Sequence, residues 1–123
     1  MKITRPFWHY TCDDKVAAIQ GAGVVVPGTP DTDGPGRYGW FADLAHPVRD
    51  ALGLTSQVLT CDRTRHRFRV TDPDALTHWI RVRRSHPWAL DLETAPGARL
   101  MHWWVATVPV PVIYDPITTG PRP

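Results

Sequence analysis

The arginines between positions 63 and 84 have the residue type and the spacing to bind phosphate. This window contains seven of the 14 Lys and Arg residues but only two acidic residues. Alternate side chains of a strand share a face, so Arg65, Arg67 and Arg69 would follow one another about 7 Å apart, close to the spacing of successive phosphates. The stripe predicts a site for a nucleic-acid backbone or a pyrophosphate. A solvated sheet face balanced by acidic loops is the alternative.

The composition narrows the chemistry further. Six of the 123 residues are Trp, which suits a core, a stacking surface or both. Exposed Trp79 and Trp88 would add base stacking, which favours single-stranded nucleic acid. The net charge of +2 argues neither for nor against a polyanionic partner. The chain lacks Gly-x-Ser-x-Gly, a Gly-Lys-Ser/Thr phosphate loop, His-Glu-x-x-His and a cluster of metal ligands, which excludes the commonest hydrolases and nucleotide kinases.

The first third of the chain predicts a strand, a helix, a short apolar segment, a loop and a second strand. These segments are residues 7–11, 11–23, 24–26, 29–36 and 38–43. His9 lies where the first strand would bring it to the edge of a cleft. Thr11 can cap the helix, Val16 and Ile19 give it a short apolar face, and Gly23 can end it in the left-handed conformation. The Gly/Pro-rich loop is either a plain connector or a flap over the site.

The rest of the chain predicts further short elements. We expect a helix at 47–53, a strand starting in 54–59, a strand at 64–70, a helix at 75–82, a loop-rich region at 87–97, a strand at 100–107, an edge strand at 112–114 and a frayed tail at 118–123. Short helices mixed with short strands favour an α+β fold over a doubly wound α/β sheet. Because no repeat or boundary is visible, residues 1–117 are expected to form a single domain.

Four motifs occur in a fixed order: Phe-Trp-His-Tyr-Thr at 7–11, Ala-Ile in the helix, Gly-Ala-Gly-Val-Val-Val-Pro at 21–27 and Tyr-Gly-Trp-Phe-Ala-Asp at 38–43. This order resembles the amino-terminal half of the ADP-ribosyltransferase superfamily. The Val-Pro-Val-Pro at 108–111 resembles the close of DNA-targeting ADP-ribosyltransferases and of RNA 2′-phosphotransferases. The resemblance implies a small α+β domain with two antiparallel sheets splayed around a cleft, flanked by short helices.

The resemblance also implies that NAD is bound in that cleft as a substrate and that its ADP-ribose is transferred to an acceptor. His9 would hydrogen-bond the ribose hydroxyls with both ring nitrogens, and Tyr10 and Thr11 would complete the cofactor-binding strand. Tyr38 or Trp40 would pack against the nicotinamide.

The sequence departs from the family at the late strand, where a Glu usually orients the ribose hydroxyl and the attacking group. His102 occupies this position here. An imidazole cannot stabilise an oxocarbenium ion as a carboxylate can. Three explanations remain open: Glu93 supplies the carboxylate, His102 is a general base in a variant mechanism, or the site binds a nucleotide without turning it over.

The arginine stripe makes DNA, RNA or a nucleotide the expected acceptor. One alternative is a non-catalytic module that binds nucleic acid or a protein through Arg65, Arg67 and Arg69. The other is an RNA 2′-phosphotransferase-like enzyme, which fits the ending and the arginines. A toxin-like role with an inhibitory partner protein is left open.

The two cysteines and the absence of long apolar segments bear on the compartment. Cys12 and Cys61 could form a disulfide or remain two buried reduced thiols. No stretch has the continuous apolar character of a signal peptide or a membrane-spanning helix. We therefore expect a cytoplasmic protein that does not bind a membrane.

Overall fold

The computed structural model describes residues 6–28, 37–45, 65–94 and 98–116. The loop expected at 29–36, the helix at 47–53, the strand at 54–59 and the tail at 118–123 lie outside these residues.

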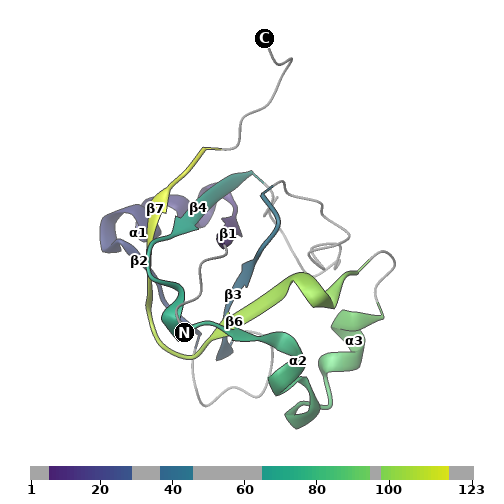
Figure 1. Ribbon diagram of the computed structural model, residues 1–123. Helices are drawn as coiled ribbons and strands as arrows, with labels where there is room; N and C mark the ends of the chain where they lie inside the picture. The colour runs from purple at the N-terminus through teal and green to yellow at the C-terminus, as the bar shows by residue number, and fades with distance from the viewer. Residues whose placement is uncertain (1–5, 29–36, 46–64, 95–97, 117–123) are drawn as a thin grey trace.

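Seven strands form one curled antiparallel sheet (Figure 1). They are β1 (Trp8–Thr11), β2 (Val24–Val25), β3 (Gly39–Ala42), β4 (His66–Val70), β5 (Thr77–His78), β6 (Trp103–Ala106) and β7 (Val110–Tyr114). Their order in the sheet is β2-β7-β4-β1-β3-β6-β5. The α-helices are α1 (Asp13–Ala22), α2 (Trp79–Val82) and α3 (Ala89–Glu93). The mixture of short helices and an antiparallel sheet confirms the expected α+β class.

The sheet is joined weakly at its centre. Strand β1 pairs with β4 through four residues, and β3 pairs with β6 through four residues. Between β1 and β3, in contrast, the ladder consists of the single pair Trp8↔Ala42. The sheet therefore divides into two well-paired halves, β2-β7-β4-β1 and β3-β6-β5. Helix α1 lies beside the first half, whereas α2 and α3 lie beyond β6, at the other end (Figure 1).

Helix α1 begins one residue later than the sequence predicts. Thr11 is the last residue of β1, is 2% exposed and pairs with His66 of β4. It therefore does not cap the helix, and the N-cap is Cys12, which makes no side-chain capping hydrogen bond. The predicted stop at Gly23 is confirmed. Its φ of 72° is the left-handed conformation that glycine adopts without a steric cost, and its N–H donates to the Ile19 carbonyl over 2.8 Å.

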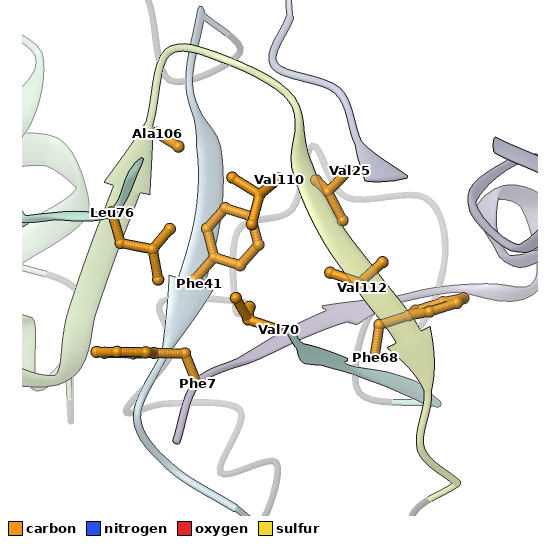
Figure 2. Close-up of a cluster of buried hydrophobic side chains, with 9 residues drawn as sticks. All are labelled: Phe7, Val25, Phe41, Phe68, Val70, Leu76, Ala106, Val110 and Val112. Carbon is orange, nitrogen blue, oxygen red and sulfur yellow. The ribbon is translucent and has the colours of Figure 1, made fainter. Parts of the chain in front are cut away.

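The main hydrophobic core lies against the first half of the sheet and reaches across to β3 and β6 (Figure 2). Its buried members are Phe7, Val25, Phe41, Phe68, Val70, Leu76, Ala106, Val110 and Val112. Val16 and Ile19 of α1 pack against this cluster, as the apolar face of the predicted helix requires. A second cluster, built around Trp79 and Trp103, lies under α2 and α3.

The expected helix at 75–82 is confirmed only in its second half, where α2 covers Trp79–Val82. Before it, residues Pro73–Ala75 form a 3-10 turn, Leu76 is extended, and Thr77–His78 form β5. Strand β5 exists because β6 offers it an open edge, with Thr77 opposite Val105 and His78 opposite Trp104. Intrinsic helix propensity is weak enough for such tertiary pairing to override it. In the loop-rich region expected at 87–97, the structure has the short helix α3.

Strand β7 is not the edge strand that the sequence predicts. It lies between β2 and β4 and pairs with both of them. Pro111 is tolerated in this interior strand because β4 has ended at Val70. At that point the ladder needs only the Pro111 carbonyl, which accepts from the Thr71 N–H over 3.0 Å.

Candidate functional site

His9 is held by the strand on the other side of the central joint. Its Nδ1 lies 2.7 Å from the backbone carbonyl oxygen of Trp40, and its ring centroid lies 5.5 Å from that of Phe41. Because a carbonyl oxygen can only accept, Nδ1 must carry the proton and donate it. The expectation that both ring nitrogens contact a ribose is therefore corrected: Nδ1 is held by the Trp40 carbonyl and anchors the ring.

His102 forms a pair with an acidic residue that directly follows β3. It is the last residue of the 3-10 turn Leu100–His102, immediately before β6. Its Nδ1 lies 2.6 Å from Oδ1 of Asp43, and the backbone N–H of Asp43 donates to the His102 carbonyl over 3.3 Å. The pair thus extends the β3–β6 ladder by one step. The side chains of His102 and Asp43 are 34% and 9% exposed.

The two histidines belong to the same face of the sheet. Trp8 and Ala42 are paired, so strand alternation assigns His9, Phe41 and Asp43 to one common face. In this register His9 lies opposite Phe41, whose ring is beside it, and Asp43 comes two positions after Phe41, about 7 Å away if the chain stays extended. His9, Phe41 and the Asp43–His102 pair are therefore assigned to one face of the sheet.

Tyr38 and Trp40 lie in a different cluster, on the opposite face of β3. The Trp40 ring centroid is 4.9 Å from that of Trp79, and Tyr38 is 6.1 Å from both Trp40 and Trp79. The Tyr38 hydroxyl and His86 Nε2 form a hydrogen bond of 2.6 Å. These two rings thus lie on the face of β3 opposite to the side chain of Phe41, and their packing against a nicotinamide stays a prediction. Phe41 is the aromatic residue that the structure places beside His9.

Glu93 lies in that aromatic cluster too, and its carboxylate is fully engaged. Oε2 accepts from Trp79 Nε1 over 2.7 Å and from Arg83 Nε over 2.8 Å, while Oε1 accepts from Arg83 Nη2 over 2.5 Å. The side chain of Glu93 is 4% exposed. The hydrogen bonds from Arg83 lower the pKa of Glu93, against an opposing effect of burial. This carboxylate holds α2 to α3 and is not directed at the His9 neighbourhood.

Tyr10 and Thr11 hold β1 in place and do not line an open surface. Both are buried, and the Tyr10 hydroxyl donates to the Leu44 carbonyl over 2.5 Å. Burial raises the pKa of Tyr10 to about 12, although the positive charge of Arg67 opposes the shift. Cys12, next along the chain, is 1% exposed and disulfide-bonded, which decides between the two alternatives left open by the sequence. Its partner lies outside the described residues.

The arginine stripe is interrupted at its centre. Arg65 and Arg69 are exposed, as strand alternation predicts. Arg67 is only 11% exposed and pairs with Asp115 over 3.1 Å. Its guanidinium also donates to the carbonyl oxygens of Ala45, Asp115 and Pro116, and lies 5.5 Å from the Trp8 ring centroid. The predicted stripe of three exposed arginines is therefore corrected to two, Arg65 and Arg69. Arg67 instead holds neighbouring segments together through its ion pair and hydrogen bonds.

Asp43 is the site residue to which sequence reasoning assigns no role. It closes the Tyr-Gly-Trp-Phe-Ala-Asp motif, and this position in the motif is the sequence signal that could have identified it.

Within the described ranges, no group of three or more His, Cys, Asp and Glu side chains could hold a metal ion. In the same residues, no helix has the length and apolar character needed to cross a membrane.

Comparison with protein-family models, curated proteins and solved structures finds no match.

Proposed function

We propose that this protein binds NAD and acts as a mono-ADP-ribosyltransferase-like protein whose acceptor is a nucleic acid or a nucleotide. One observation carries the proposal. His9 is fixed through Nδ1 beside the single-pair joint between β1 and β3, and it shares a sheet face with the Asp43–His102 pair. His9 and Asp43 belong to the segment at 7–43 whose motifs resemble the superfamily, and His102 comes from the late turn before β6.

The proposal assigns a distinct task to each half of the sheet. From the first half, the His9 side chain contacts a ribose hydroxyl of NAD, while Tyr10 and Thr11 hold its strand. From the second half, the Asp43–His102 pair lies near the acceptor. Tyr38 and Trp40 stabilise β3 on its opposite face through their contacts with Trp79. Glu93 is left out of the chemistry because three hydrogen bonds already hold it.

The decisive experiment is a calorimetric titration of the protein with NAD. We expect wild-type protein to bind NAD with a dissociation constant of about micromolar order and His9→Ala to bind at least about tenfold more weakly. His66→Ala is the matched control, because His66 lies on β4 and is held by Tyr114 and Asp13. It should bind NAD as the wild type does. Wild-type protein that does not bind NAD at all would refute the proposal.

A second candidate function rests on the exposed arginines. Arg65 just before β4, Arg69 on β4, and Arg81 and Arg84 around α2 are all exposed. A non-catalytic module that holds nucleic acid would use this charge, and its affinity for an oligonucleotide would fall steeply with salt. Arg69→Gln should then weaken oligonucleotide binding, whereas His9→Ala should not. Binding of NAD that depends on His9 favours the first proposal instead.

A further inference from the structure

The Asp43–His102 pair differs from the other histidine environments of the described residues. The Asp43 carboxylate, 9% exposed, can only accept a hydrogen bond, so His102 Nδ1 carries the proton and donates it over 2.6 Å. The second nitrogen, Nε2, then carries the lone pair. Within the described ranges Nε2 makes no hydrogen bond, and the His102 side chain is 34% exposed. His102 thus combines a basic nitrogen with a partly exposed side chain, and a carboxylate holds the other side of its ring.

The other histidines show how specific this arrangement is. His78 Nδ1 accepts from the Ile80 N–H over 3.1 Å, so its Nε2 carries the proton and donates to the Met101 carbonyl. His66 has a partner on each nitrogen, Tyr114 on Nδ1 and Asp13 on Nε2. His9 Nδ1 donates to a neutral backbone carbonyl, that of Trp40. A carboxylate stabilises an imidazolium more strongly than a neutral carbonyl does.

We propose that Asp43 is the positioning residue that makes His102 a general base, and that the acceptor is a hydroxyl or a ring N–H group that loses its proton during transfer. This inference rests on the proposed function. It explains how the site can work without a Glu on the late strand: the negative charge is still present, but it acts through the imidazole.

The proposed step balances as follows. The acceptor oxygen or nitrogen attacks the ribose carbon that carries the nicotinamide and forms a new bond to it. The carbon–nitrogen bond to nicotinamide breaks, and its electron pair leaves with the nicotinamide as a neutral molecule. The acceptor proton passes to His102 Nε2, and Asp43 stabilises the resulting imidazolium. The proton is then released to solvent, so NAD⁺ and the acceptor yield the ADP-ribosylated acceptor, nicotinamide and one proton.

The acceptor class follows from the strength of this base. A carboxylate acceptor is already deprotonated at neutral pH, since its pKa is about 4, and needs no base. An arginine side chain stays charged at every ordinary pH and holds its proton too tightly for an imidazole to remove it. Hydroxyl groups and ring N–H groups are neutral acceptors that lose a proton only as the new bond forms. Nucleotides carry both, in agreement with the acceptor proposed above.

The test compares Asp43→Asn and His102→Gln with wild-type protein in three measurements. NAD affinity is measured by calorimetry, and the protonated nitrogen of His102 by nitrogen NMR of histidine-labelled protein. Nicotinamide release from NAD is measured with water alone and with single-stranded DNA or RNA oligonucleotides as acceptors. Glu93→Gln is the control, because it changes a carboxylate that lies in the other cluster.

We expect both variants to keep the wild-type affinity for NAD within about twofold and to release nicotinamide about 10²–10⁴-fold more slowly, the usual contribution of a general base. Wild-type His102 should carry its proton on Nδ1, and Asp43→Asn should populate the other tautomer, a change that a merely structural role would not require.

Three results would overturn the inference. Release by Asp43→Asn at the wild-type rate would do so while leaving the NAD site intact. A wild-type His102 protonated on Nε2 would refute the positioning role, whatever the activity. A wild-type protein that binds NAD but never releases nicotinamide would remove the base from the reaction. If wild-type protein fails to bind NAD, the proposed function itself falls, and the inference falls with it.

Discussion

The carboxylates of Glu93 and Asp43 lie in two different clusters and are bound by different partners. This difference distinguishes a structural carboxylate from one that can take part in proton transfer. Glu93 accepts hydrogen bonds from Arg83 and Trp79, and its side chain is 4% exposed. Asp43 holds one nitrogen of His102, whose side chain is 34% exposed. Arginine remains charged at every ordinary pH, so the first group cannot exchange a proton usefully, whereas a histidine can. The partner of a carboxylate therefore says more about its role than its burial does.

The largest effect that this comparison predicts is on stability, in Glu93→Ala. The substitution leaves the indole N–H of Trp79, a residue that is 0% exposed, without its acceptor and leaves Arg83 without its partner. We expect a loss of about 2–4 kcal/mol in the free energy of unfolding, measured by urea denaturation. Leu90→Ala on the same helix is the control; Leu90 is 63% exposed, so a change within about 0.5 kcal/mol is expected. A loss in Glu93→Ala no larger than in this control would break the comparison.

Tyr10→Phe is expected to lower the free energy of unfolding by an intermediate amount, and only below the pH at which the phenol of the folded protein ionises. It removes the hydrogen bond to Leu44, and we expect a loss of about 1 kcal/mol. The pKa of Tyr10 is raised in the folded protein from 10.0 to about 12, so its contribution is fully present below pH 10 and is lost as the pH rises from 10 through about 12. Urea midpoints of wild type and variant should converge over this range. A constant difference would show that the phenol is not buried as described.

A smaller and more specific effect is expected in acid. Arg83 lowers the pKa of Glu93 below its ordinary value of 4.5. The stabilisation is therefore present above pH 4.5 and is lost as the pH falls through the lowered pKa of the folded protein. In Glu93→Gln the side chain does not titrate, so its stability should depend less on pH below 4.5 than that of the wild type. Exposed Asp74→Asn should follow the wild-type curve. Parallel wild-type and Gln curves would contradict the assignment.

The smallest expected change in stability is in His102→Gln. The side chain is one third exposed and fills no core position, so the free energy of unfolding should change by no more than about 0.5 kcal/mol. Thermal unfolding of this variant beside Glu93→Ala measures the contrast directly. A loss as large as that of Glu93→Ala would mean that the Asp43–His102 pair is mainly structural.

Local features were predictable where the sequence carries its own signal. The β1 strand follows from its aromatic run, and the end of α1 follows from Gly23, whose φ of 72° few other residues adopt. The β4 strand follows from the alternation of Arg with His66, Phe68 and Val70. In each case the deciding interaction is short in sequence, and the residues themselves encode it.

Features decided by distant partners were not predictable. Thr77 and His78 became a strand because β6 presents an edge to them. Alternation placed Arg67 on the correct face, but its partner Asp115 comes from a segment 48 positions away. The Asp43–His102 pair joins residues 59 positions apart and depends on the register of β3 against β6. The sequence pattern identified His102 as a candidate site residue, but no local pattern indicated that Asp43 would be its partner.

The interior position of β7 sets the order in which the protein can fold during synthesis. Strand β2 pairs only with β7 among the described strands, and β4 has an unpaired edge until β7 arrives. While the ribosome is still making residues 110–114, both earlier strands are exposed, as nascent edges open to wrong partners. The first half of the sheet can therefore be completed only late, when β7 pairs with both β2 and β4. The protein is expected to fold slowly and largely after β7 has left the ribosome.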